Sequence, residues 1–358
     1  MKKRLFVCTV MFGLAVLMVY NAAGQVVLET INQPVHLVEL ADETIREIAW
    51  HPGGEILAVA TSENILLLSA DLQAELARIT HEGTSVTWSP DGQYLALGYE
   101  TTVEVWAWDE TAQSLSLMQT LNGFATQQAV TWSPDGQYLA SLGSRNIEDL
   151  LVAGSLHIWN TDTWTLDTFT KDAYSLDQME RHADGLDWML DAANVPMLIT
   201  MGPQISVEND RLVGFSREFN VYIINPATGQ VENTTLIPTG GIVLAWQPNT
   251  SLISIGGEIA VSLYDYVTGE RVISYGYMAN VETLAWSPDG RYLMADDILV
   301  DGYTETEFGF FYQPYPSPRV ISTKWRPGHD ELAIALENEI TIQDPTLFSD
   351  YEAMVEDE

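Results

Sequence analysis

Histidine and paired acidic residues are the side chains of this 358-residue chain that could do acid–base or metal chemistry. The six histidines are widely separated: His36, His51, His81, His157, His182 and His329. Neighbouring acids such as Asp296 and Asp297 could hydrolyse a glycoside only with a partner across a cleft, and 50 Asp and Glu produce such pairs by chance. No G-x-S-x-G elbow, H-E-x-x-H helix, phosphate-binding loop or dinucleotide fingerprint occurs. We therefore predict no catalytic residue, no metal site and no cofactor, and a protein that is not an enzyme.

The N-terminus has the layout of a secretory signal peptide. Three basic residues at positions 2–4 precede an apolar run, 5–20, and the small residues 22–24 follow it. We expect cleavage after Gly24, which places the mature chain outside the cell or in the periplasm; an uncleaved membrane anchor is the alternative. Cys8, the only cysteine, leaves with the signal, so the mature chain has no disulfide and no thiol nucleophile.

The formal net charge of −35 excludes some classes of partner. An acidic surface is repelled by nucleic acid and by anionic membranes, so we predict neither nucleic-acid binding nor membrane insertion after the signal is removed. A hydrophobic content of 46% is too high for a disordered chain. We expect a folded monomer.

One short motif is written several times along the chain. WSPDGQYLA stands at 88–96 and again at 132–140, and WSPDGRYLM stands at 286–294. Weaker copies also open with tryptophan, and together they give seven structural anchors: Trp50, Trp88, Trp132, Trp188, Trp246, Trp286 and Trp325. The anchors recur at about 40 residues, with longer intervals on both sides of Trp188, which is the period of a blade-like repeat unit.

Each repeat unit reads as four antiparallel strands. An alternating run such as TSVTW precedes the tryptophan, and S-P-D-G then makes a tight turn in which we expect positive φ at Gly92, Gly136 and Gly290. A second strand such as YLALGY, a third such as VEVWAWD and a fourth such as RVISY or WTLDTFT follow. Four strands cannot bury both faces alone, so we expect radial packing of the units with the tryptophans between neighbours.

These motifs resemble the WD-repeat β-propeller family. The likeness rests on V-x-W-S-P-D-G-x-x-L-A and on the third-strand endings VWAWD (105–109) and HIWN (157–160), and it covers the mature chain. The resemblance implies an all-β, seven-bladed β-propeller of four-stranded antiparallel blades. Six-bladed Tol-B-type propellers also use W-S-P-D-G, but their third strands read differently. The Gly-His pair that usually precedes the inner strand in this family is absent, and Trp-Asp survives only at Trp108-Asp109, so we expect apolar packing in place of the family's hydrogen-bond tetrad.

The predicted domains are the signal peptide at 1–24, the propeller at 25–345 and an acidic C-terminal tail at 346–358. The last repeat lacks an outer strand, whereas HLVEL (36–40) precedes the first anchor without a blade of its own. Since the first strand commonly completes the last blade in the WD-repeat family, we expect the N-terminal strand to close the ring.

Long insertions indicate where a partner could bind. We expect insertions between second and third strands at 144–154, 203–219 and 296–307, with a further long connection at 170–185, all on one face. Arginine and aromatic side chains are typical interface anchors. The predicted partner-binding residues are Arg145, Tyr174, Arg181, Arg217, Tyr303 and Tyr312. Tyr315 also belongs there if FGFF is the buried third strand of the sixth blade.

The function predicted from these patterns is that of an exported, non-enzymatic scaffold for a protein or peptide partner. Two alternatives remain: a propeller enzyme of the lactonase or hydrolase kind, and a binder of a small molecule or metal at the channel mouth. An enzyme needs histidines or carboxylates that converge on that mouth, and the repeat spacing shows none.

Overall fold

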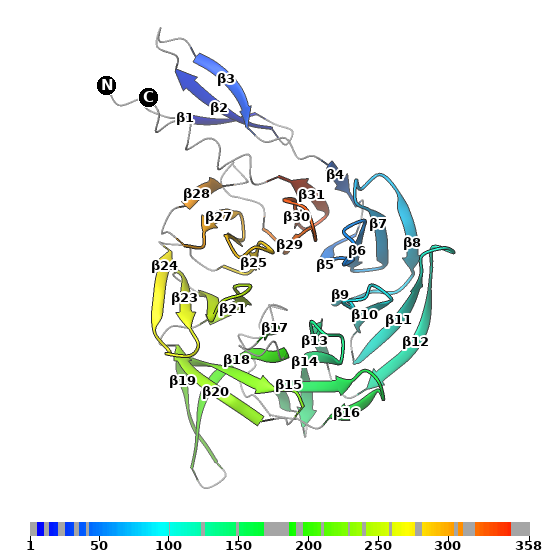
Figure 1. Cartoon of the computed structure of the whole chain (residues 1–358), viewed down its shortest axis with the longest axis vertical. Coiled ribbons are helices and arrows are strands. Elements are labelled where there is room, and N and C mark those ends of the chain that lie inside the picture. Colours follow the sequence, from blue (N-terminus) through cyan, green and yellow to red (C-terminus); the bar gives the residue numbers. More distant parts are fainter. Residues whose placement is uncertain are drawn as a thin grey trace.

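The computed structural model is an all-β propeller of four-stranded antiparallel sheets, grouped around a central axis (Figure 1). The structure describes residues 6–10, 14–20, 26–31, 36–40, 43–99, 101–122, 126–147, 150–167, 186–190, 196–208, 211–227, 230–237, 241–257, 260–275, 281–303, 307–310 and 319–344. Within these ranges, no helix is long and apolar enough to cross a membrane.

Six sheets consist of four consecutive strands each, paired in chain order, and we call them blades. The first three are β5 (Ile45–Trp50), β6 (Ile56–Thr61), β7 (Ile65–Ser69), β8 (Glu75–Ile79); β9 (Ser85–Trp88), β10 (Tyr94–Tyr99), β11 (Thr102–Asp109), β12 (Ser114–Asn122); and β13 (Thr126–Trp132), β14 (Tyr138–Ile147), β15 (Leu150–Asn160), β16 (Thr165–Asp167). The next three are β17 (Leu186–Leu190), β18 (Pro196–Glu208), β19 (Arg211–Asn225), β20 (Gln230–Ile237); β21 (Gly241–Trp246), β22 (Leu252–Gly257), β23 (Val261–Asp265), β24 (Arg271–Tyr275); and β25 (Leu284–Trp286), β26 (Tyr292–Ala295), β27 (Ile298–Asp301), β28 (Glu307–Phe310).

A further four-stranded sheet is composite. It joins β29 (Ser322–Trp325), β30 (Leu332–Ala335) and β31 (Glu339–Gln343) to β4 (His36–Glu39), and Ile340 of β31 pairs with Val38 of β4. The described chain therefore has six blades of consecutive strands, whereas seven anchors predict seven blades. The difference arises because the seventh anchor, Trp325, lies in this composite sheet, whose fourth strand comes from the other end of the chain.

The N-terminal segment forms a separate three-stranded antiparallel sheet, drawn in dark blue beside the propeller in Figure 1. Its strands are β1 (Phe6–Val10), β2 (Leu14–Tyr20) and β3 (Val26–Ile31), paired in the order β1-β2-β3. The predicted signal peptide, 1–24, includes the first two of them, and its removal stays a prediction. The predicted acidic tail, 346–358, lies outside the described residues.

The repeated turn is built identically in its three full copies. In the first copy the Ser89 hydroxyl donates to Asp91 Oδ1 at 2.6 Å, and the same oxygen accepts from the Gln93 N–H at 3.0 Å. The Tyr94 N–H donates back to the Ser89 hydroxyl at 2.9 Å. Positive φ at Gly92, Gly136 and Gly290 is confirmed, with values of 72°, 73° and 72°. The letters S-P-D-G-x therefore specify a turn that satisfies its own polar groups.

The core lies between blades as much as within them. One cluster joins Ile48 and Val59 of the blade β5–β8 to Ala335 and Ile340 of the composite sheet. A second joins Leu67 of the same blade to Val86 and Trp88 of the next. Second strands such as β6, whose six residues are all buried, pack on both faces. Each sheet thus depends on both neighbours for its apolar burial.

The inserted segments differ from the expectation. Residues of 144–154 and 203–219 extend the hairpins β14–β15 and β18–β19 as paired strands, because the ladder continues to Ile147↔Leu150 and Glu208↔Arg211. In the sixth blade FGFF is not the third strand. The third strand is β27, which pairs with β26, and Glu307–Phe310 forms the fourth strand, β28.

Candidate functional site

A cavity of about 470 Å³ lies at the centre of the propeller. Residues in or next to the first strands of the six blades and of the composite sheet line it. Consecutive first strands are in contact from β5 through β9, β13, β17, β21 and β25 to β29, and β29 also contacts β5. The cavity is lined by anchor tryptophans such as Trp88 and Trp286 and by turn prolines such as Pro248 and Pro288. We call the side with these turns, which also carries the connections from third to fourth strands, the turn face.

The charged residues that line this cavity are Glu47 and Lys324. Lys324 Nζ lies 3.8 Å from Glu47 Oε1, and Glu47 Oε2 accepts the Val86 N–H at 3.0 Å. Glu47 is buried, at 8% exposure. The pair joins β5 to both neighbouring first strands, β29 and β9. Its chemistry is that of a structural ion pair, because one carboxylate oxygen accepts a backbone N–H and the other lies beside the lysine.

Several anchor tryptophans bond to the preceding blade through their indole N–H. Trp325 donates to the Ala285 carbonyl at 3.0 Å, Trp188 donates to the Thr131 carbonyl at 3.4 Å, and Trp50 donates to the Lys324 carbonyl at 3.1 Å. Each acceptor is the residue directly before the previous anchor. These bonds join first strands edge to edge around the cavity.

The residue after an anchor tryptophan accompanies a second contact between blades at six of the seven anchors; at the other, Trp188, it is Met189. Where it is serine, the tyrosine six positions after the tryptophan stacks on the next anchor: Tyr94 on Trp132, Tyr138 on Trp188 and Tyr292 on Trp325, with ring centroids 6.4, 6.5 and 6.5 Å apart. We call these contacts stacked seams. Each one buries two aromatic rings between neighbouring turns.

Where a longer polar side chain follows the tryptophan, it crosses to the next turn instead. His51 Nε2 lies 3.2 Å from the Gly92 carbonyl, Gln247 Nε2 donates to the Gly290 carbonyl at 2.7 Å, and Arg326 Nε donates to the Gly54 carbonyl at 2.7 Å. We call these bridged seams. Sequence reasoning missed these contacts, although the sequence shows that the residue after the anchor tryptophan is Ser in some repeats and His, Gln or Arg in others.

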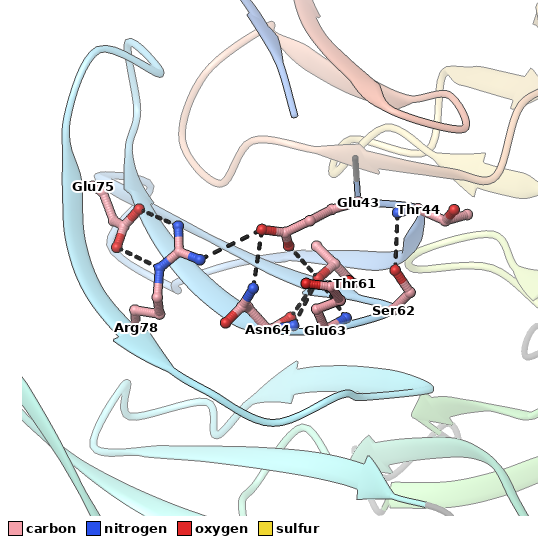
Figure 2. A network of polar contacts seen from close by, with 8 residues as sticks. All are labelled: Glu43, Thr44, Thr61, Ser62, Glu63, Asn64, Glu75 and Arg78. Carbon is pink, nitrogen blue, oxygen red and sulfur yellow. Dashed lines mark hydrogen bonds and ion pairs between the residues drawn. The ribbon is translucent and has the colours of Figure 1, made fainter. Parts of the chain in front are cut away.

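A polar network occupies the opposite end of the blade β5–β8, and Figure 2 shows Arg78 lying between Glu75 and Glu43. Arg78 donates to both oxygens of Glu75, at 2.9 and 2.8 Å, and contacts Glu43 Oε1 at 3.4 Å. Glu43 also accepts from Thr61 Oγ1 at 2.6 Å and from Asn64 Nδ2 at 2.9 Å. The hydrogen bonds from Arg78 lower the pKa of Glu75 below its ordinary value. Arg78 and Glu75 are partly exposed, so this network is not a buried tetrad, and the expectation that apolar packing takes the tetrad's place stays a prediction.

Asp296 has a related position in the blade β25–β28. Its Oδ1 accepts the N–H groups of Thr283 and Glu282 at 2.8 and 3.0 Å, just as Ser62 Oγ accepts the Thr44 N–H at 3.1 Å in the first blade. Burial raises the pKa of Asp296 to about 6, although the hydrogen bonds from Thr283 and Glu282 act in the opposite direction. Asp296 ties the start of β25 to the turn before β27, a structural role.

Whether the predicted partner-binding residues gather on one surface stays a prediction, because Tyr303 is the only one of the six whose side chain is described. Arg145 lies in β14 opposite Val152 and Arg217 lies in β19, but their side chains are outside the described residues, as are Tyr174, Arg181, Tyr312 and Tyr315 altogether. Tyr303 is described and 61% exposed. It follows the third strand β27, and the Gly302 N–H donates to the Arg291 carbonyl of a repeated turn. Tyr303 therefore lies on the turn face, opposite to the predicted one, because 298–301 is a strand rather than part of an insertion.

Comparison with known proteins gives one family. The family model described as Eukaryotic translation initiation factor eIF2A matches residues 18–177, a segment that contains the anchors Trp50, Trp88 and Trp132. No curated protein matches the chain. Across the described residues, no group of three or more His, Cys, Asp or Glu side chains is placed to hold a metal ion.

Proposed function

We propose that this chain is an exported, non-enzymatic propeller that holds a protein or peptide partner at its turn face. The observation that supports this role is the central cavity of about 470 Å³, which is large enough for a few side chains and is walled by tryptophan and proline. Its charged lining residues, Glu47 and Lys324, pair with each other. A partner would therefore meet tryptophan and proline side chains next to polar threonines, and among the described lining residues the acid and the base are already paired, which favours binding over catalysis.

We also propose that the composite sheet is the seventh blade and that β4 closes the ring in the manner of the WD-repeat family. Three contacts support closure: the ladder between β31 and β4, the Trp50–Lys324 hydrogen bond, and the Arg326–Gly54 hydrogen bond. In this arrangement β4 pairs with the side of β31 that would otherwise be an unpaired edge.

The matched family name raises translation initiation as a second candidate function. The acidic composition weighs against a role that needs contact with RNA, because a chain of net charge −35 is repelled by phosphate. The similarity covers 18–177 and supports a shared repeat architecture in that segment. A filter-binding assay with mixed RNA at low salt separates the two candidates: saturable RNA binding would favour the initiation role.

Export is tested by locating the native chain. We expect it in the extracellular or periplasmic fraction, with an N-terminal peptide that begins after Gly24. Recovery from the cytosol with residues 1–24 intact would contradict export. Recovery with membranes and an intact N-terminus would indicate an anchor instead.

The binding role is tested by selecting peptides from a displayed random library on the purified chain. Thr87 lines the cavity, so Thr87→Phe should fill part of it and weaken the selected peptides, whereas Thr163→Phe on an exposed turn should not. Failure to enrich any peptide would contradict the scaffold function. Turnover of an ester or lactone panel that Thr87→Phe abolishes would favour the enzyme alternative.

A further inference from the structure

A second cavity, of about 510 Å³, lies on the turn face between the blades β9–β12 and β13–β16. Three aromatic side chains line it, Tyr94, Trp132 and Trp164, together with three acidic ones at its exposed turns: Asp91, Asp135 and Asp162. No basic side chain is among the described residues that line it. Aromatic faces and carboxylates attract the same kind of ligand, a cation with an apolar surface.

The three rings form walls in two orientations. Tyr94 and Trp132 are nearly parallel, with an interplanar angle of 22°, and Trp164 meets Trp132 edge to face at 85° with centroids 6.1 Å apart. Trp132 is buried at 7% exposure, and its indole N–H has no hydrogen-bond partner among the described residues. A ligand that fills this cavity can therefore be held by ring faces.

Trp164 is placed here by an unusual backbone conformation. Its φ is 53°, in the left-handed region that bulky residues avoid. The Trp164 N–H donates to the Asn160 carbonyl at 2.8 Å, and Asn160 Oδ1 accepts from the Asp162 N–H at 3.0 Å. The turn thus presents an aromatic ring and a carboxylate side by side. Strained residues of this kind persist where the surroundings fix them, often at binding sites.

A second stacked seam of the same chain shows which chemistry this surface accepts. At the Tyr292–Trp325 seam, the guanidinium carbon of Arg291 lies over the Tyr292 ring, 4.9 Å from its centroid. The position that corresponds to Arg291 is Gln93 at the Tyr94–Trp132 seam. The Tyr292–Trp325 seam therefore has a cation of the chain itself over its tyrosine. The Tyr94–Trp132 seam has the neutral Gln93 at that position and an acid-lined cavity beside it.

We propose that the cavity at the Tyr94–Trp132 seam binds an organic cation of the alkylammonium class, held by Tyr94, Trp132 and Trp164 and oriented by Asp162. The cation can be a free quaternary amine or the methylated lysine side chain of a peptide. This site does not depend on the proposed scaffold function, because the purified chain can be titrated directly.

The test is calorimetric titration of the full mature chain with choline and with its neutral carbon isostere, 3,3-dimethylbutanol. We expect saturable binding of choline. The affinity for the isostere should be lower by a factor of about ten or more, since only the charged ligand gains from the rings and carboxylates. Equal binding of both ligands, or no saturable heat with choline, would overturn the proposal.

Two variants locate the site without altering its core. Asp162→Asn removes one exposed charge and should weaken choline severalfold. Gln93→Arg supplies the chain's own cation in the manner of Arg291 and should abolish binding, whereas the control Gln137→Arg at the next seam should not. Undiminished binding by Gln93→Arg would place the cation elsewhere and contradict the proposal.

Titration with N-acetyl-trimethyllysine methylamide then separates the two sources: tighter binding than choline indicates a peptide, and weaker binding indicates a free amine.

Discussion

Stacked and bridged seams connect neighbouring blades in two different ways. In a stacked seam, serine closes its own turn and leaves the contact to two rings, as in Tyr138 on Trp188. In a bridged seam, the side chain after the tryptophan reaches the next turn, as Gln247 reaches the Gly290 carbonyl. It can also bond within its own turn, as His51 Nδ1 accepts the Gly53 N–H at 3.0 Å. The residue at this position therefore decides whether a hydrogen bond crosses the blade boundary.

The difference explains why the repeat is written so uniformly in some units and so loosely in others. A stacked seam needs Ser, Asp and Gly for its turn and Tyr for its contact, so the full nonapeptide is required. A bridged seam needs one long polar side chain and a carbonyl of the next turn within its reach, which tolerates sequences such as WHPGG and WRPGH. The weaker copies at Trp50, Trp246 and Trp325 therefore follow a different contact rule from the strong ones.

The largest expected effect comes from breaking the bridged seam at Arg326. This buried side chain donates to the Gly54 carbonyl, pairs with Glu331 and Glu55, and lies over the Trp50 ring, 5.4 Å from its centroid. Arg326→Ala should lower the free energy of unfolding by about 3 kcal/mol, because it leaves a partly buried Glu331 without its partner. Urea denaturation measures the loss.

Arg271→Ala on the exposed strand β24 is the matched control, expected to change stability by less than about 0.5 kcal/mol. An Arg326→Ala loss no larger than the control's would mean that the contact between β29–β31 and β5–β8 does not stabilise the propeller, and it would weaken the proposal of closure.

The opposite face offers a contrast to both seams, because Asp296 is held there by backbone N–H groups in a buried position. Its folded-state pKa of about 6 lies above the ordinary value of 3.8. The stability that it contributes is therefore full below pH 3.8 and is lost as pH rises through 6, by about 3 kcal/mol at most.

Asp296→Asn keeps the accepting oxygen and removes the ionisation, so the variant should be more stable than the parent at pH 7 and similar to it at pH 3.5. Thermal unfolding at both pH values gives the comparison. A variant less stable than the parent at pH 7 would show that the charge itself stabilises this corner.

Much of the propeller was accessible from the sequence, and the parts that were not have identifiable causes. The turns could be predicted because Ser89, Asp91 and Gly92 satisfy one another within five residues, so no distant contact is needed. The turn at Trp164 carries no glycine, yet Trp164 has a left-handed backbone and contacts Trp132, an anchor 32 positions earlier. Such positions give no local signal.

The strand assignment predicted for the sixth blade was wrong for a related reason. The run 298–301 is short and follows Asp296 and Asp297 closely, so it does not stand out as a strand. The more apolar FGFF fits a buried third strand better. The pairing of 298–301 with β26 supplies the burial that the sequence pattern does not show. The seam contacts were missed because they join residues about 40 positions apart, which no local pattern records.

A matched pair of glycines isolates the bridging side chain. Gly92 and Gly136 occupy the same turn with nearly the same φ, but a Cβ on Gly92 would lie 2.2 Å from His51 Nε2, whereas a Cβ on Gly136 would meet nothing closer than 3.7 Å. Gly136→Ala should therefore cost about 1 kcal/mol from backbone strain alone, and Gly92→Ala about 2 kcal/mol or more.

The double variant Gly92→Ala with His51→Ala removes the steric conflict, so the two changes should be less than additive in urea denaturation. Strict additivity would mean that His51 does not occupy the seam as described.

The smallest effect tests whether a stacked seam depends on its ring or on its hydroxyl. Tyr138 stacks on Trp188 at 6.5 Å with an interplanar angle of 22°. Tyr138→Leu retains an apolar side chain but loses the ring pair, so the free energy of unfolding should fall by about 1 kcal/mol. Tyr138→Phe keeps the ring and should stay within about 0.5 kcal/mol of the parent. Urea denaturation of both variants at pH 7 shows whether the ring or the hydroxyl of Tyr138 makes the contact. If Phe costs as much as Leu, the hydroxyl carries the contact, and stacked seams are then polar contacts of the same kind as bridged ones.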